Sequence, residues 1–100
     1  MPRVLSLVSF SIEACHKDEF LARASAELKP YWESHGSLRY EVYEEMGPTG
    51  PTGRVVELNI LQDREAYHAM TEHVRTAGDL PAVPYRHVTE PQFQVMEWRV

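Results

Sequence analysis

Several residues that could take part in chemistry lie within one short stretch, Val55 to Val74, which reads VVELNILQDREAYHAMTEHV. Glu57 and Asn59 share parity on a predicted strand, so their side chains point to the same side, about 6.6–6.8 Å apart. His68 and His73 follow on a predicted helix. Carboxylates, amides and imidazoles accept protons or stabilise developing negative charge in enzymes. The stretch therefore predicts either the wall of a pocket or a solvated face.

Each of these residues also has an ordinary structural interpretation. Glu57 could pair with Arg39 across a hairpin, and Asn59 could bond to the backbone. His68 could pair with Glu72 at i, i+4 on a solvated helix flank. A carboxylate in the middle of an apolar strand costs free energy unless it is paired, which keeps a functional role for Glu57 open.

The two histidines do not form a metal-binding pair. Five positions separate His68 from His73, which places them about 140° apart around a helix, whereas paired helical zinc ligands are spaced i, i+4. Cys15 is the single cysteine, so neither an internal disulfide nor a cysteine zinc site is expected. No glycine-rich dinucleotide loop is present. We therefore expect no metal and no other cofactor.

Length and charge narrow the class of protein. The 100 residues are enough for a single domain, 1–100, with one modest core. The net charge is −5 and the basic residues are scattered, which disfavours nucleic acid and anionic membranes as partners. The first twenty residues have the pattern of a strand followed by an acidic helix rather than of a signal peptide. With one cysteine and no long apolar run, we expect a cytoplasmic protein.

The periodicity of apolar residues predicts the element order β-α-β-β-α-β. Pro30 should kink or tighten the first helix, Asp63 should cap the second, and GPTGPTG over Gly47–Gly53 should form a hairpin loop. This order is typical of an α+β, ferredoxin-like fold, a four-stranded antiparallel sheet with two helices on one face. The predicted strands are 3–10, 37–46, 54–62 and 92–100, and the predicted helices are 17–36 and 63–76.

The other face of such a sheet has no partner within the chain. We expect this open face to be too apolar to remain in water, which predicts a homodimer. The residues expected on it are Glu41, Tyr43, Val55, Glu57, Asn59, Leu61, and Met96 or Trp98.

Two stretches resemble signatures of the antibiotic biosynthesis monooxygenase family. ESHGSLRYEVYEE is similar to its helix end, glycine, small residue, leucine and strand. VVELNILQDREAYHAMTEHV is similar to a second signature: a strand glutamate, an aromatic residue two positions on, and a helix with two histidines five apart. Here Asn59 takes the aromatic position. The resemblance implies a dimeric α+β barrel with two sheets packed face to face. It also implies oxygenation of phenolic or quinol-type substrates without a cofactor.

The family includes a haem-degrading branch, from which this sequence departs. That branch carries an asparagine on the first strand, where this chain offers Ser6 and Ser9. It also carries a tryptophan that is missing from this region. These departures disfavour haem chemistry.

Cofactor-free oxygenation needs a base, a group that stabilises an oxyanion, and an apolar cavity that excludes water. We predict this cavity between the Val55–Leu61 strand, the Ala66–Val74 helix and the Leu80–His87 connection. The predicted roles are proton acceptance by His68, oxyanion stabilisation by Asn59, orientation of a partner by Glu57, and substrate contacts by Tyr43, Trp98, Tyr85, His73 and Arg86.

Two other classes of function fit the same residues. One is a non-catalytic dimeric module that binds a small aromatic or acyl ligand. The other is a related barrel enzyme such as an isomerase, cyclase or decarboxylase. A cavity in which polar atoms lie beside an aromatic wall would favour an enzyme, whereas a cavity filled with apolar side chains would favour the module.

Overall fold

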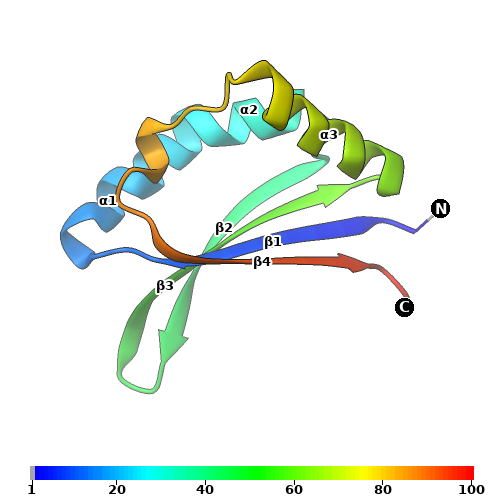
Figure 1. Cartoon of the computed structure of the whole chain (residues 1–100). Coiled ribbons are helices and arrows are strands. Elements are labelled where there is room, and N and C mark those ends of the chain that lie inside the picture. Colours follow the sequence, from blue (N-terminus) through cyan, green and yellow to red (C-terminus); the bar gives the residue numbers. More distant parts are fainter. Residues whose placement is uncertain (1) are drawn as a thin grey trace.

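The computed structural model describes residues 2–100. Its elements follow the predicted order (Figure 1). The first helical segment is divided into α1, a turn of π-helix (η1) and α2, and the connection after α3 holds one 3-10 turn (η2). The bounds are β1 Val4–Ser11, α1 Ala14–Arg23, η1 Ala24–Leu28, α2 Lys29–Ser34, β2 Arg39–Gly47, β3 Gly50–Leu61, α3 Arg64–Ala77, η2 Val83–Tyr85 and β4 Thr89–Glu97.

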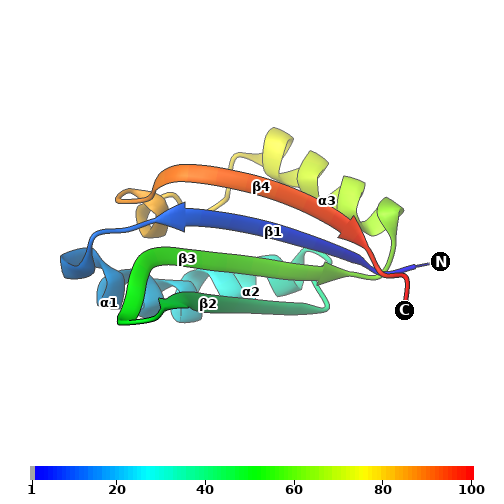
Figure 2. The same ribbon diagram turned by 90° about the horizontal axis from the view of Figure 1, so that it is seen from below.

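The four strands form one antiparallel sheet in the order β2-β3-β1-β4. The helices lie over one face and leave the other bare, as Figures 1 and 2 show from two directions. We call these the covered face and the open face. The predicted α+β, ferredoxin-like arrangement with two helices on one face is therefore confirmed.

Alternation along β3 places the polar residues on the covered face. Val55 and Leu61 are buried in the core, where Leu61 packs with Met70 of α3. Glu57 and Asn59 share their parity and point the same way. The prediction that these four residues lie on the open face is wrong. Both faces of β3 carry apolar side chains, so the pattern did not decide which one the helices cover. The open-face residues are Val56, Leu58 and Ile60.

The open face does carry the aromatic residues expected on it. Tyr43 is 51% exposed and pairs in register with Val56, and Trp98 is 64% exposed beside Met96. Leucines and isoleucines of the central strands are half-buried between them. Apolar side chains therefore gather on this face, beside the ion pair of Arg39 and Glu41 on β2.

Local sequence explains how the helical segments begin and end. The helix is irregular at the predicted place, because the π-helical turn η1 precedes Pro30, which lacks an N–H and stands at the start of α2. A π-helical turn is wider than an α-helical turn, so the expected tightening is not what occurs. Gly36, at φ 111°, turns the chain towards β2. Asp63 caps α3, because its Oδ1 accepts the Ala66 N–H at 2.8 Å.

The hairpin and the last strand differ from the prediction. β2 reaches Gly47 and β3 starts at Gly50, so a two-residue turn joins them and the expected loop through Gly53 is wrong. Pro51 can lie in this strand because it sits in the outer part of the hairpin, where the register is irregular. β4 begins at Thr89, three residues earlier than expected.

The connection after α3 folds back over the covered face. Gly78, at φ 66°, ends the helix, and Pro84 of η2 is buried. Tyr85 and Leu80 join the core cluster beneath α1. The connection is thus held down by its own side chains. Within residues 2–100, none of the helices has the length and apolar character that a bilayer crossing requires.

Candidate functional site

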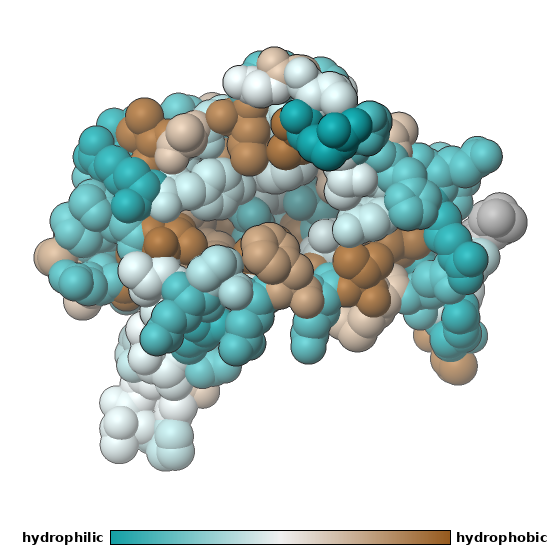
Figure 3. Space-filling model, viewed as in Figure 1, coloured by the Kyte–Doolittle hydropathy of each residue, from teal (hydrophilic) through white to brown (hydrophobic). Residues whose placement is uncertain are grey.

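A group of converging, buried polar side chains lies in a cleft between the helices and the covered face. Two adjoining cavities of about 170 and 290 Å³ form it, and both are lined by Val8, Trp32, Glu57, Val74 and Phe93. Figure 3 shows a recess, bordered by apolar side chains, between the helical layer and the sheet. The remaining lining residues are Ser6, Asn59, Tyr67, Met70 and Thr71 in the smaller cavity and Phe10, Leu80, Tyr85, Val88 and Pro91 in the larger.

Glu57 is the carboxylate of the cleft and is 3% exposed. Its Oε2 accepts hydrogen bonds from two phenols, Tyr40 on β2 and Tyr85 on η2, each at 2.7 Å. The Trp32 indole N–H donates to the Tyr85 hydroxyl oxygen at 3.3 Å. Four side chains from β3, β2, the connection and α2 therefore form one hydrogen-bonded chain, which we call the Glu57 network.

Burial controls the protonation of the Glu57 network. Loss of hydration raises the pKa of Glu57 above its ordinary value, against the opposing effect of the hydrogen bonds from Tyr40 and Tyr85. Burial, and then the nearby Glu57 carboxylate, raise the pKa values of both phenols well above the usual range. The tyrosines therefore stay protonated and act as donors. Glu57 is the group of this network that can exchange a proton with a ligand.

Asn59 supplies a second polar group to the smaller cavity. Its side chain is 5% exposed, and its Oδ1 has no hydrogen-bond partner among residues 2–100. The expected bond from this oxygen to the backbone is therefore absent there. An unsatisfied buried polar atom costs about 1–3 kcal/mol. By rotating, the amide can present either its oxygen or its NH₂ group to a ligand.

Glu57 does not form the expected pair with Arg39. The Arg39 guanidinium instead contacts Glu41 at 2.8 Å on the open side of β2. Residues with opposite strand parity point to opposite faces, which separates Arg39 from Glu57. The predicted ion pair is wrong, and tyrosines take its place.

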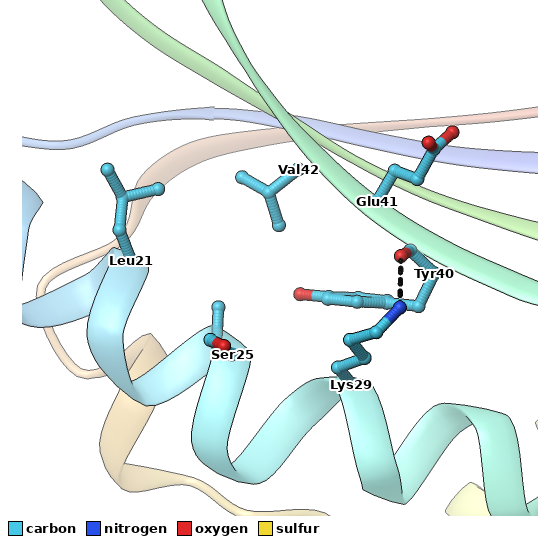
Figure 4. Close-up of a pocket in the computed structure, with 7 residues that line it drawn as sticks. Leu21, Ser25, Lys29, Tyr40, Glu41 and Val42 are labelled. Atoms are coloured by element: carbon cyan, nitrogen blue, oxygen red, sulfur yellow. Dashed lines mark hydrogen bonds between the residues drawn. The ribbon is translucent and has the colours of Figure 1, made fainter.

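A separate pocket of about 160 Å³ lies between the first helical segment and β2 (Figure 4). Lys29 reaches over its rim and donates to the Tyr40 carbonyl oxygen at 3.4 Å, while its ammonium also pairs with Glu33. Its other lining residues are Leu21, Ala24, Ser25, Glu41 and Val42. We favour the cleft as the site because its carboxylate is buried and has a perturbed pKa.

The structure brings three of the eight predicted site residues together. Glu57, Asn59 and Tyr85 line the cleft. Tyr43 and Trp98 lie on the open face, across the sheet from it. The other three are on outer helical surfaces or the connection, namely His68, which is exposed on α3; His73, which contacts Asp79; and Arg86, which pairs with Glu19.

Tyr40 and Trp32 are not among the site residues predicted from the sequence, so their place in the network was missed. Tyr40 is buried in the core, and its hydroxyl donates a hydrogen bond to Glu57. The sequence does contain a signal: an unpaired carboxylate on a buried strand needs donors, and tyrosine and tryptophan are the residues that combine an apolar body with a donor. Which of the five tyrosines and two tryptophans would serve depended on the fold.

Solved structures with this fold were found, although no protein-family model and no curated protein matches the sequence. A Bordetella bronchiseptica protein with the provisional name antibiotic biosynthesis monooxygenase has a TM-score of 0.77 at 10% identity, with 100% of both chains covered. SnoaB, a cofactor-independent oxygenase from Streptomyces nogalater, has a TM-score of 0.68 at 16% sequence identity, with 100% of this chain and 96% of SnoaB covered. A dimeric ferredoxin-like protein from an uncultured marine organism has a TM-score of 0.72 at 11% sequence identity, with 100% of this chain and 90% of that protein covered.

These similarities define the class of fold. The chain has a ferredoxin-like fold, as its sequence predicts, and its structural neighbours include proteins described as dimeric and ferredoxin-like. The resemblance to antibiotic biosynthesis monooxygenases is confirmed at the level of the fold, since proteins bearing that name are among its structural neighbours.

Proposed function

We propose that this protein is a cofactor-independent monooxygenase that binds a small phenolic or quinol-type aromatic molecule in the cleft. The observation that carries the proposal is Glu57, a buried carboxylate with a raised pKa on an otherwise apolar wall. Neighbours that include a cofactor-independent oxygenase support the reaction class. The apolar lining suits an aromatic ring, and the carboxylate suits its hydroxyl group.

Glu57 takes the role of proton acceptor in this proposal, in place of His68. An ordinary carboxylate has a pKa of about 4.3 and a phenol one of about 10, so an exposed glutamate is a poor base for a phenol. Burial raises the pKa of Glu57 and narrows that difference. His68 is exposed and is not among the residues lining either cavity, so it has no route to a bound substrate.

Asn59 and the two phenols provide the supporting groups. Asn59 lies one strand repeat from Glu57 and can donate its amide N–H to an oxygen that becomes negative. Tyr40 and Tyr85 hold the Glu57 carboxylate in place through Oε2. Because both bonds end on that one oxygen, Oε1 is the atom that would accept the substrate proton.

The proposed reaction inserts one oxygen atom of O₂ into the substrate and releases the other as water. Glu57 removes the phenol proton, and the resulting anion transfers one electron to O₂. The substrate radical and superoxide combine to form a C–O bond, and the peroxide takes back a proton from Glu57. Loss of water from the C–H carbon that bears the peroxide leaves a carbonyl group. The substrate supplies all the electrons, so for a phenol the equation is HO–Ar–H + O₂ → O=Ar=O + H₂O.

We also propose that two copies of the chain associate through the open face. Met96 and Trp98 are exposed there, beside a cavity of about 380 Å³ that Leu5 and Ile60 also line. Apolar patches of this kind usually mark an interface. Two neighbours with the same fold are described as dimeric. In this proposal Tyr43 and Trp98 contact the second copy rather than the substrate.

Oxygen uptake with a panel of quinols tests the proposed activity. Glu57→Gln and Asn59→Ala should each lower the rate by about 10²–10³-fold, the usual cost of removing a base or an oxyanion donor. His16→Ala, outside the cleft, is the control and should keep the wild-type rate. Loss of activity in His68→Gln with full activity in Glu57→Gln would return the role of base to His68. Equal rates in all variants would favour a non-catalytic ligand-binding module.

A further inference from the structure

Three potential metal ligands meet on the outer side of the helical layer, away from the Glu57 network. His35 follows the end of α2, His73 lies in α3, and Asp79 begins the connection. Their ligand atoms all lie within 4.8 Å of one another. The two imidazole rings stack with centroids 4.1 Å apart, and His73 Nε2 lies 3.2 Å from the Asp79 carboxylate.

Tyr31 orients two of the three side chains. Its carbonyl oxygen accepts the His35 Nδ1–H at 2.7 Å. A carbonyl can only accept, so this bond assigns the proton to Nδ1 and leaves the Nε2 lone pair free for a metal. Its hydroxyl donates to Asp79 Oδ1 at 2.8 Å. Such partners behind the ligands are the usual support of a metal site.

We propose that His35, His73 and Asp79 form a site for a divalent transition metal ion, with Zn²⁺ as the preferred occupant. Two imidazole nitrogens and one carboxylate oxygen are donors that zinc accepts, and they leave a fourth tetrahedral position for water. Calcium and magnesium prefer sets of oxygen ligands, which this cluster does not provide. The site lies outside the cleft, and none of its three ligands lines it.

Binding needs small side-chain movements. Tetrahedral zinc with bonds of about 2.0–2.1 Å places its ligand atoms about 3.3 Å apart. His73 Nε2 and the Asp79 carboxylate already have this separation, at 3.2 Å. The movement is needed at His35, whose ligand atom lies within 4.8 Å of the others and must approach them by at most about 1.5 Å, with the imidazole rings tilting out of their stack. His73 and Asp79 are partly exposed, at 35% and 52% of their side chains, so neither is locked by packing.

The position of the site indicates what the metal would do. It joins α2, α3 and the connection, three segments that hold the cleft closed on its helical side. Trp32, Val74 and Leu80 line the cleft and lie one to three residues along the chain from a ligand. A bound ion would fix the connection against the helices and so stabilise this wall.

A zinc titration of the metal-free protein tests the proposal. Isothermal calorimetry with Zn²⁺ should give one ion per chain in the wild type and the same affinity in His68→Gln, a matched control with an exposed histidine on the same helix. His35→Gln and His73→Gln should lose this binding. Tyr31→Phe should weaken it by about 10–100-fold, as loss of a supporting partner usually does. Circular dichroism without zinc confirms that each variant is folded.

Thermal unfolding gives a second, independent readout. Zinc should raise the midpoint of the wild type and of His68→Gln but not that of His35→Gln, because a ligand that binds the folded state stabilises it. Wild-type zinc affinity in His35→Gln or His73→Gln would overturn the proposal. So would an equal loss in His68→Gln, or no binding by the wild type at micromolar zinc.

Discussion

Replacing Glu57 with glutamine should change how the stability of the protein depends on pH. The unfolded glutamate has a pKa of about 4.3, and burial raises the pKa in the folded protein. Between these two values the folded state binds a proton that the unfolded state has released. The stability of the wild type therefore falls as the pH rises through this window. Glutamine does not titrate, so Glu57→Gln lacks this loss.

The size of the effect depends on how far folding raises the pKa of Glu57. Each unit by which folding raises the pKa of Glu57 is worth about 1.4 kcal/mol of differential stability. Between acid and neutral pH, the free energy of unfolding of Glu57→Gln relative to wild type should therefore rise by about 1.4 kcal/mol for each unit by which the pKa is raised. The amide is nearly isosteric, and its oxygen can still accept from Tyr40 and Tyr85. Packing therefore contributes little to the difference.

Urea unfolding at a series of pH values measures this difference directly. Tyr40→Phe and Tyr85→Phe provide matched controls, because each removes a donor that lowers the pKa of Glu57. In both backgrounds the total change in stability relative to a variant that also carries Glu57→Gln should become larger, and it should extend to higher pH. If the wild type instead gained stability relative to Glu57→Gln as the pH rose, the hydrogen bonds would outweigh burial. The pKa of Glu57 would then be lowered, and the assignment of Glu57 as a base would fail.

Three further predictions concern the fold and the open face. Asp63→Ala should destabilise the protein by about 0.5–2 kcal/mol in urea unfolding through loss of the α3 cap; an unchanged midpoint would contradict the cap. Arg64 and Arg99 lower the pKa of Glu97 to about 2, so the stability that this carboxylate contributes is lost as the pH falls from about 4.3 towards 2. Glu97→Gln should lack this acid-side loss, and identical profiles of stability against acid pH in the two proteins would refute the pairing. Trp98→Glu should shift sedimentation from dimer to folded monomer, whereas a stable dimer in this variant would place the interface elsewhere.

The element order could be predicted from the sequence because it rests on local patterns. Asp63 before an amphipathic stretch, Gly36 after one, and alternation around Tyr40 are local signals, and each has the expected structural outcome. The hairpin was less predictable. Glycine and proline suggested a loop up to Gly53, but strand pairing extended across them to Gly50.

The composition of the site depended on which face of the sheet the helices cover. β3 is apolar on both sides, so the sequence did not determine whether Glu57 and Asn59 would be inside or on the open face. Once they are inside, Tyr85 arrives from a segment 28 residues away. His35 and His73 likewise meet through helix packing rather than through spacing in one helix. Pattern analysis within one element does not detect such contacts between elements.

A crystal structure of the protein with a bound phenolic substrate analogue would test the central claim most directly. The account predicts the aromatic ring in the cleft between β3, α3 and the connection, with its hydroxyl oxygen within hydrogen-bonding distance of Glu57 Oε1. The same crystal of Glu57→Gln should show weaker occupancy at the same position. Binding on the open face or in the pocket beside Lys29, with the cleft empty, would contradict the account.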